Sequence, residues 1–476
     1  MQLSFRDPHG QLLKSEDRVL RFVNAEGTKR LDSFLSSGVA HRLTDTGHLV
    51  KTNLVTSVEA DRLADHHLFK GRRLQYSAVV EHERINFTNF PYEWSASMLY
   101  EAARLTLNLA REIAKEGFGL KDATPDNILF RGPKPVFVDM LSFEPRDPRD
   151  PTWLPYAQFV RTFLLPLLVS KRLDLTPGQI FLPNRDGLTP EAVYEMCGFL
   201  QRIRPPFLSL VTIPKLLGAR GPASQLYKQS RLTTTGQAQF VLENLFRRLG
   251  RQLKRTHPSA RSTSAWSSYS DTNRADSSEY FWMKRSFVAE ILSDRRPEKL
   301  LDIGCNIGEF SEIAANHGAE VVAIDSDAKV VDTIWRSAHG KGLKILPLVV
   351  DIARPSPAVG WCNNENLSFI DRSNGFFDAV LMLAIIHHLV VTERIPLDQI
   401  LSLAADLTTS DLIIEYIAPE DEMFQQILRG RDELHRGLTR ELFEETCRFR
   451  FEVVKMQQTP RPTRWLYHLR KRIDNC

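Results

Sequence analysis

Hydrophobic and polar positions alternate regularly along the C-terminal part of the chain. Five short apolar runs are separated by segments with helical spacing, namely Lys299–Gly304, Glu320–Asp325, Lys344–Val350, Asp378–Ala384 and Asp411–Ile417. Strand, helix and strand in regular succession predict a parallel, doubly wound α/β sheet. Two closing runs, Phe451–Gln458 and Arg464–Leu469, predict an antiparallel hairpin at the end of this sheet.

The N-terminal part has a different pattern. Roughly its first ninety residues show short strand-like runs with turns such as Asp45-Thr46-Gly47. Ser95–Glu116 has apolar residues at helical spacing and no breaker, so we expect a long helix there. The stretch from Trp153 to Leu249 is mostly helical and interrupted by prolines. These patterns predict an α+β module followed by a helical extension.

A segment rich in Arg, Lys, Ser and Thr lies between about Arg247 and Asp276. It cannot bury enough apolar surface to fold alone, so we interpret it as a linker rather than a nucleic-acid-binding arm. Aromatic residues near Trp282 predict that its end docks on the next domain. We expect four parts: an α+β module (1–150), a helical extension (151–250), a linker and docking arm (251–285) and a C-terminal domain (286–476).

Composition excludes several classes of protein. The chain has 476 residues, 42% hydrophobic and 25% charged, with a net charge of +4, which is too small to indicate a polyanionic partner. The most apolar run, Phe159–Ser170, is too short to cross a bilayer, and the start MQLSFRDPHG has no secretory pattern. Five scattered cysteines without a CxxC pair support neither disulfides nor a metal site. We therefore expect a cytoplasmic protein with neither membrane nor nucleic-acid partner.

The turn after the first C-terminal strand carries the strongest chemical signal. Asp302, Gly304, Asn306 and Gly308 occupy alternate positions of a strand-to-helix turn. Residues that tolerate positive φ suit a backbone that passes close to a ligand, and Asn is the side chain that best replaces Gly there. The spacing is not the G-x-G-x-x-G of a dinucleotide site, which argues against NAD. The turn resembles that of Rossmann-like class I methyltransferases that use S-adenosylmethionine, which implies that it approaches the methionine end of this cofactor.

Acidic residues end the next two strands. Asp325 lies about twenty residues after the turn, where a carboxylate holds ribose hydroxyls, and Asp327 suits the N-cap of the following helix. Asp351 ends the third strand, where the resemblance implies a contact with the adenine amino group. As an isolated residue, Asp351 is equally consistent with a solvated loop position.

Two histidines follow the fourth strand. His387 or His388 is a candidate general base for an acceptor hydroxyl. The alternative is that one caps the turn while the other packs over the cofactor. Methyl transfer from a sulfonium needs little beyond positioning, so a base is not obligatory.

The segment LKDATPDNILFRGPKPVFVDMLSFE resembles the catalytic segment of kinase-like phosphotransferases. Asp122 and Asn127 have the D-x-x-x-x-N spacing, and Asp139 falls at the second metal-binding position. A Gly-rich loop, the usual His and Phe-Gly are missing, and Lys51 and Lys70 are only candidates for the phosphate-binding lysine. We interpret the segment as a degenerate kinase-like scaffold; turn-capping aspartates or an active small-molecule kinase are the alternatives.

Most of the chain resembles one bacterial family. The phrases that carry the likeness are SGVAHRLTDTGHLVKTNLV, FPYEWSASMLYEAARLTLNLA, GLKDATPDNILF and LIIEYIAPEDEMFQQILRGRDEL. They resemble the two-part methyltransferases of the NoeA type, named for a rhizobial host-specific nodulation protein. This implies an S-adenosylmethionine-dependent enzyme that modifies a host-recognised product, with a small-molecule or glycan-type acceptor. A non-catalytic cofactor sensor or scaffold is the alternative class.

A long connection between Ile352 and Phe377 interrupts the C-terminal pattern. Long insertions at the ligand end of such sheets are often functional, so it is a candidate acceptor-binding loop, or else a surface flap. The residues of interest in it are Trp361, Asn363, Glu365, Ser368 and Arg372.

Overall fold

The computed structural model describes residues 2–3, 6–14, 18–64, 76–218, 231–258, 278–428 and 437–472. The chain divides into two compact units. Unit 1 comprises Met1–Arg131 and Pro135–Ala260, and unit 2 comprises Gly132–Lys134 and Arg261–Cys476. Within the described ranges, no helix combines the length and apolar character needed to cross a membrane.

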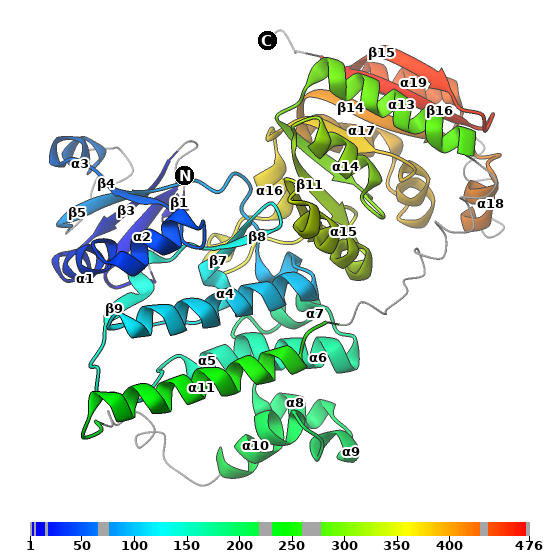
Figure 1. The fold of residues 1–476 in the computed structure, drawn as a ribbon. Helices are drawn as coiled ribbons and strands as arrows, with labels where there is room; N and C mark the ends of the chain where they lie inside the picture. Colours follow the sequence, from blue (N-terminus) through cyan, green and yellow to red (C-terminus); the bar gives the residue numbers. More distant parts are fainter. Residues whose placement is uncertain are drawn as a thin grey trace. The chain divides into compact units, whose positions relative to one another are not determined.

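A seven-stranded sheet with the order β12-β11-β10-β13-β14-β16-β15 forms the centre of unit 2 (Figure 1). Its strands are β10 (Lys299–Ile303), β11 (Glu320–Asp325), β12 (Ile345–Val349), β13 (Phe377–Met382), β14 (Thr408–Ile417), β15 (Phe451–Gln458) and β16 (Arg464–Lys471). The strands from β12 to β14 are parallel, whereas β16 is antiparallel to both β14 and β15. The predicted doubly wound sheet and its closing hairpin are confirmed.

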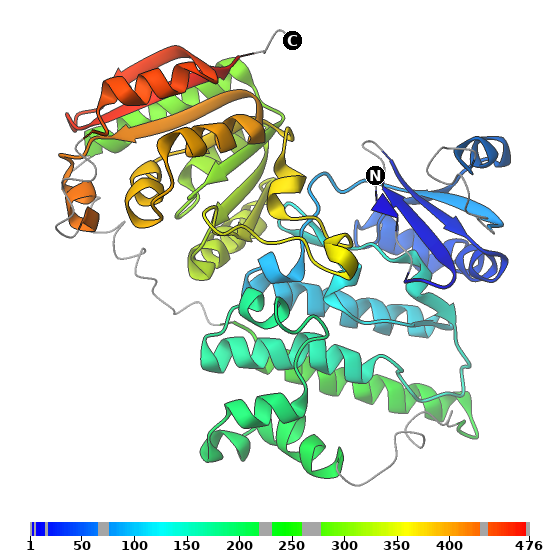
Figure 2. The same cartoon turned by 180° about the vertical axis from the view of Figure 1, so that it is seen from behind.

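Helices cover both faces of this sheet. One face carries α13 (Ser278–Arg295), α14 (Glu309–Asn316) and α15 (Ala328–Lys341), and the other carries α17 (Leu397–Leu407) and α19 (Arg440–Arg448) (Figures 1 and 2). Two short helices, α16 (Phe369–Ser373) and α18 (Glu422–Leu428), lie in the connections. Asp327 is the N-cap of α15, as predicted, and accepts the N–H of Lys329 at 2.8 Å. Phe287, Leu292 and Ile334 belong to the buried core between α13, α15 and the sheet.

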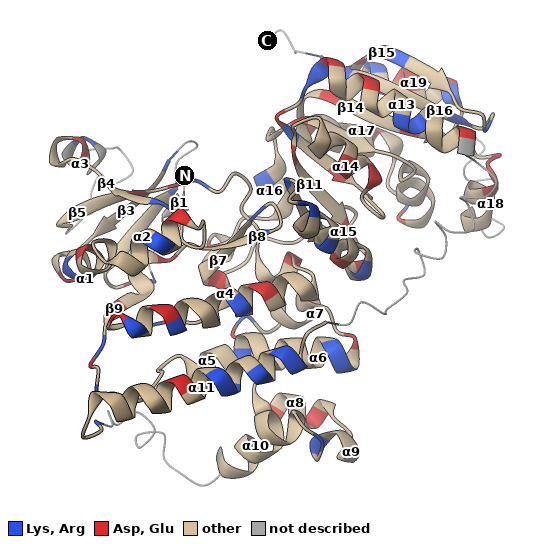
Figure 3. Cartoon of the chain, in the orientation of Figure 1, with Lys and Arg blue, Asp and Glu red and all other residues tan. Residues whose placement is uncertain are grey.

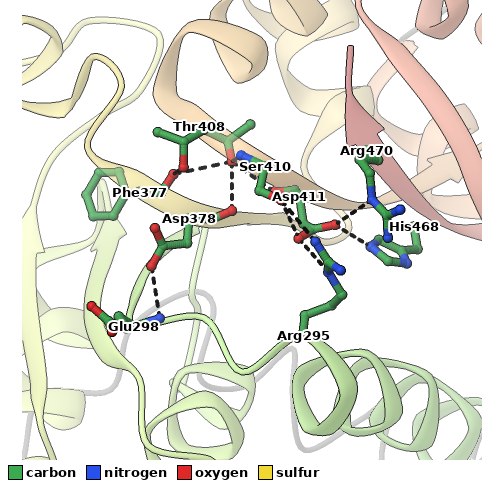
Figure 4. A network of polar contacts seen from close by, with 10 residues as sticks. Arg295, Glu298, Phe377, Asp378, Thr408, Ser410, Asp411, His468 and Arg470 are labelled. Carbon is green, nitrogen blue, oxygen red and sulfur yellow. Dashed lines mark hydrogen bonds and ion pairs between the residues drawn. The ribbon is translucent and has the colours of Figure 1, made fainter. Parts of the chain in front are cut away.

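A polar network ties α13, β14 and β16 together at the amino ends of the parallel strands (Figure 4). The carboxylate of Asp411 accepts hydrogen bonds from Arg295 Nε and Ser410 Oγ, both at 2.9 Å, and lies 2.8 Å from His468 Nε2. Asp378 accepts the backbone N–H groups of Glu298 and Lys299 at 2.9 Å. The network lies at the opposite strand ends from those that carry the candidate site.

Unit 1 begins with a five-stranded antiparallel sheet of order β1-β2-β3-β5-β4. The strands are β1 (Gln2–Leu3), β2 (Gly10–Lys14), β3 (Val19–Val23), β4 (Thr52–Leu54) and β5 (Ala78–His82). The sequence pattern predicted short strands in this region but not its helices, which are α1 (Ala25–Leu35), α2 (Gly38–Asp45) and α3 (Ser57–Ala64). Asn24 and Ser37 cap the first two helices, whose amphipathic stretches are short enough to be mistaken for strands.

The long predicted helix is α4 (Ala96–Lys115). Two short strand pairs follow it, formed by β6 (Phe118–Leu120) with β9 (Phe143–Pro145) and by β7 (Ile128–Arg131) with β8 (Lys134–Phe137). The apolar run near Phe159 is buried and helical, as expected. The helical extension contains α5 (Tyr156–Phe159), α6 (Leu165–Leu173), α7 (Pro177–Phe181), α8 (Pro190–Met196), α9 (Phe199–Arg202), α10 (Ile213–Gly218) and α11 (Thr235–Arg255).

Helix α11 continues into the stretch whose composition predicts a linker. Its basic residues recur along the ribbon (Figure 3), while Leu249 and Leu253 are buried on the other side. Burial of this apolar stripe stabilises a helix that composition alone does not reveal. Residues 259–277 of the predicted linker lie outside the described residues, and the last part of the predicted segment, from Ser278, is the start of α13.

Candidate functional site

A cavity of about 810 Å³ opens in unit 2 at the carboxyl ends of the parallel strands. Ligands of open α/β sheets bind at this edge, where the strand order reverses between β10 and β13. Of the residues predicted for the site, the cavity is lined by Asp302, Gly304, Asn306, Asp325, Asp351, His387 and His388. Gly308 does not line it.

The turn after β10 has the backbone conformation that its residue types predict. Gly304, Asn306 and Gly308 have φ values of 72°, 45° and 81°. A Cβ atom on Gly304 would lie 2.7 Å from Ile385 Cδ1, and one on Gly308 would lie 2.9 Å from Ile334 Cγ1. Gly308 is the N-cap of α14, and its lack of a side chain leaves room for the packed side chain of Ile334.

Two carboxylates stand beside this turn. Asp302 is 2% exposed and accepts a hydrogen bond from Ser311 Oγ at 2.6 Å; its burial raises the pKa to about 6. Asp325 accepts the backbone N–H groups of Asn306 at 3.1 Å and of Asp327 at 2.9 Å. Burial also raises the pKa of Asp325. Each carboxylate oxygen has two lone pairs, so Asp325 can still accept hydrogen bonds from a ligand.

Asp351 lies at the end of the third strand and is partly neutralised by a neighbour. It accepts the N–H of Ala353 at 2.9 Å and a hydrogen bond from Arg354 Nη1 at 3.0 Å. Arg354 also donates to Glu393 at 2.5 Å. These contacts fix the orientation of the Asp351 carboxylate, and Asp351 lines the cavity.

His387 and His388 lie close together, with ring centroids 4.2 Å apart. His387 is 3% exposed, and its Nδ1 atom has no hydrogen-bond partner among the described residues. Burial, reinforced by His388 and Arg464, lowers the pKa of His387 to about 3. Burial also lowers the pKa of His388. His387 is therefore neutral near pH 7 and can accept a hydrogen bond there.

A buried ionic cluster, of which Tyr280, Lys284 and Arg464 line the cavity, was not found from the sequence. Lys284 of α13 donates to Glu415 of β14 at 2.6 Å, and Tyr280 also donates to Glu415. Arg464 binds Asp421 through two hydrogen bonds of 2.7 and 2.8 Å and donates to Tyr280 Oη at 3.2 Å. The sequence contains one sign of this cluster: Glu415 is a single acid within the apolar strand LIIEYI, which indicates a buried charge that needs a partner.

The residues singled out in the insertion after β12 lie away from this cavity, although Ile352 at its start lines it. Trp361 is 67% exposed and its N–H donates to Glu365 at 3.1 Å, while Ser368 is the N-cap of α16. None of the five residues singled out in this connection lines the cavity. A role of the insertion in acceptor binding stays a prediction.

The kinase-like segment of unit 1 forms a separate hydrogen-bonded group. Asp139 accepts hydrogen bonds from Arg21 Nη1 and Ser142 Oγ, both at 2.5 Å, and Asn127 Nδ2 donates to Ser142 Oγ at 3.3 Å. Asp122 instead accepts from Gln158 Nε2 at 3.3 Å.

Arg21, and not the candidate Lys51, is the cation paired with Asp139 in this group. Arg21 was missed, although a lone cation at the centre of the apolar strand VLRFV indicates a buried ion pair. Lys51 is exposed, and Lys70 lies outside the described residues.

Comparisons with known proteins agree with the fold of unit 2. A family model for a methyltransferase domain matches residues 278–446. Unit 2 is thus a class I methyltransferase domain that uses S-adenosylmethionine. Nodulation protein NoeA of Rhizobium meliloti (strain 1021) is 30% identical over 480 residues, which cover 98% of this chain and 94% of NoeA. The chain belongs to the NoeA family, which confirms the resemblance drawn from the sequence.

Solved structures also resemble part of the chain. N-methyltransferase NodS from Bradyrhizobium japonicum WM9, in complex with S-adenosyl-L-homocysteine, is 15% identical and has a TM-score of 0.32, covering 42% of this chain and 91% of NodS. The bifunctional kinase-methyltransferase WbdD is 20% identical and has a TM-score of 0.30, covering 42% of this chain and 40% of WbdD.

Proposed function

We propose that this protein transfers a methyl group from S-adenosylmethionine to a small-molecule or glycan-type acceptor, in the making of a product recognised by a host. The name of its relative, a nodulation protein, supports the biological setting. The cavity carries the chemical part of the proposal, because Asp302, Asp325 and Asp351 border one half and cationic and aromatic residues border the other. Its volume of about 810 Å³ is within the range of small-molecule sites, about 300–1,000 Å³.

The residues at the strand ends fit the cofactor. Asn306 Oδ1 is buried at the cavity without a hydrogen-bond partner among the described residues, as expected of an atom that a ligand satisfies. We assign Asp325 to the ribose hydroxyls, Asp351 to the adenine amino group, and the turn with Asp302, Gly304 and Asn306 to the methionine end. When bound, the cofactor supplies an electrophilic methyl group on a sulfonium.

His387 and His388 are assigned to the acceptor. Neutral His387 can accept a hydrogen bond from an acceptor hydroxyl or amine and so orient a lone pair toward the methyl group. A general base works best with a pKa near the working pH, and a pKa of about 3 makes His387 a poor proton acceptor. We therefore assign positioning to His387 and proton removal, where the acceptor needs it, to His388.

For unit 1 we propose a kinase-like scaffold without phosphotransfer. The observation that supports this is the ion pair of Arg21 with Asp139, because the guanidinium takes up the carboxylate that would hold a metal. The alternative, an active small-molecule kinase, requires Asp139 to leave Arg21 and Ser142.

The experiment is to supply the purified full chain with methyl-labelled S-adenosylmethionine and an extract of small molecules and oligosaccharides, and to identify the labelled product. S-adenosylhomocysteine serves as a competing control. We expect labelled material in the small-molecule or oligosaccharide fraction, suppressed by the competitor. Cofactor binding without a labelled product would favour the sensor, and label on nucleic acid or protein would contradict the proposed acceptor class.

A further inference from the structure

Charges are divided between the two halves of the cavity. Asp302, Asp325 and Asp351 line the half at β10, β11 and β12, whereas Lys284, Arg461 and Arg464 line the half at β14 and β16. Ion pairs neutralise Lys284 through Glu415 and Arg464 through Asp421. A fourth cation that lines the cavity, Arg285, is paired with Glu309.

Arg461 is the exception among the cations that line the cavity. Within the described ranges no carboxylate lies within 4.0 Å of its guanidinium, which instead lies over the Tyr280 ring, 4.9 Å from the centroid. The residue is half-buried. An arginine held partly out of water without a counter-ion is poised to bind an anion, because the guanidinium fork matches carboxylate and phosphate groups.

Along the sheet, Arg461 lies away from the half of the cavity that Asp302, Asp325 and Asp351 line. It precedes β16, which begins at Arg464, and neighbouring strands lie about 4.8 Å apart. β16 is three strands from β10 and four from β11, which corresponds to about 14 and about 19 Å. If the ribose lies at β11 and the methionine end at the turn after β10, then Arg461 lies beyond the methyl group, on the acceptor side.

We propose that Arg461 binds an anionic group of the acceptor, a carboxylate, phosphate or sulfate. This inference rests on the proposed function and specifies its substrate class. Tyr280, which contacts Arg461, and Trp282, which lines the cavity yet is 67% exposed, give this anion site an aromatic surface for the rest of the acceptor. The carboxylate of the cofactor is the other possible source of the anion, and the first arm of the test separates the two.

The first arm measures calorimetric binding of S-adenosylhomocysteine and of 5′-methylthioadenosine, which lacks the carboxylate. Wild type, Arg461→Gln and Arg461→Lys are compared, with Arg450→Gln, an exposed arginine outside the cavity, as the matched control. We expect the affinity of all four proteins for S-adenosylhomocysteine to agree within about twofold. A loss of about tenfold or more in Arg461→Gln that is absent for 5′-methylthioadenosine would assign Arg461 to the cofactor and overturn the proposal.

The second arm titrates inorganic phosphate into each protein saturated with S-adenosylhomocysteine. We expect millimolar binding to wild type and Arg450→Gln, at least about fivefold weaker binding to Arg461→Gln, and recovery in Arg461→Lys. Equal phosphate binding by Arg461→Gln and wild type, or none by wild type, would overturn the proposal. Unchanged melting temperatures show that the variants are folded.

The labelled product provides an independent check. The inference is supported if the labelled product is anionic and the KM for its unmethylated acceptor rises about tenfold in Arg461→Gln. A neutral labelled product contradicts the anion site but leaves methyl transfer intact, so the two proposals fail separately.

Discussion

Asp325 joins the turn after β10 to the start of α15, because its two oxygens accept the N–H groups of Asn306 and Asp327. We predict that Asp325→Ala weakens S-adenosylhomocysteine binding by about tenfold or more, since buried charge-assisted hydrogen bonds to the ribose are lost. Asp327→Asn is the matched control, because Asp327 caps α15 and is not among the residues that line the cavity. Calorimetry on both variants tests the assignment, and an unchanged affinity of Asp325→Ala removes this residue from the site.

The two histidines should differ in their kinetic effects. We expect His388→Ala to slow methyl transfer about 10²-fold if the acceptor loses a proton, with little change in cofactor affinity. His387→Ala should lower the rate without removing a limb of the pH profile between pH 5 and 9, because a group with a pKa of about 3 does not titrate there. Rate–pH profiles of both variants on the identified acceptor provide the measurement. Full rates in both would refute a role for either ring.

Asp302 gives a stability prediction with a definite sign. Its pKa is raised from 3.8 to about 6 by burial, so the folded state loses stability relative to the unfolded chain as the pH rises through about 6. Asp302→Asn removes this loss and should stabilise unit 2 by up to about 3 kcal/mol at pH 8, with the gain vanishing near pH 4. Urea unfolding at both pH values tests it. If Asp302→Asn is less stable than wild type at pH 8, the ionised Asp302 carboxylate is stabilised by the groups around it, which would contradict this prediction.

At the scale of elements, Asp411 of β14 connects this strand to the end of α13 through Arg295 and to β16 through His468. Burial alone would raise the pKa of this carboxyl, but hydrogen bonds from His468, Arg295 and Ser410 lower it overall. A lowered pKa contributes stability above the ordinary carboxyl value, and that stability is lost as the pH falls through the folded pKa.

Asp411→Asn should therefore destabilise unit 2 by about 1–3 kcal/mol at pH 7, and by less at pH 4. Glu290→Gln, which breaks an exposed pair of α13 with Lys455, is the control and should change stability by at most about 0.5 kcal/mol. Urea denaturation of both variants checks the prediction. Equal losses in the two variants would mean that the network adds nothing beyond a surface pair.

The elements of unit 2 could be predicted because each strand is a short apolar run bounded by turn residues. β11 and β15 have the bounds expected from the sequence, and β14 begins earlier, at Thr408, where the side chain is buried. We predicted Asp325, Asp351 and the turn after β10 because each of them directly follows or ends an apolar run that the sequence marks as a strand. Lys284 and Glu415 were missed because they are 131 positions apart, and a sequence alone does not show which buried charges meet.

At the scale of the whole molecule, unit 1 raises the question of nucleotide binding. Burial alone would raise the pKa of Asp139, but the charge of Arg21 and the hydrogen bonds of Ser142 and Arg21 lower it overall. We expect ATP with millimolar magnesium to leave the melting temperature of the full chain unchanged. Asp139→Asn should destabilise the protein by about 1–2 kcal/mol through the loss of charge-assisted hydrogen bonds. A thermal-shift assay decides: strong stabilisation by ATP that disappears in Asp139→Asn would establish a nucleotide-dependent module.

The first turns of α13 determine where a fragment containing the methyltransferase domain can begin. The boundary expected at Ser286 falls inside α13, between Lys284 and the core residue Phe287. A fragment cut there would keep Glu415 fully buried in β14 while discarding both Tyr280 and Lys284, and removing one partner of a buried ion pair typically costs about 3–5 kcal/mol. The start of α13, which lines the cavity with Tyr280 and Lys284, therefore also supplies a counter-ion to the sheet. A fusion or rearrangement that exchanges the N-terminal unit and keeps this ion pair has to join the chain ahead of Tyr280, so the cavity-lining start of α13 and the methyltransferase sheet are inherited together.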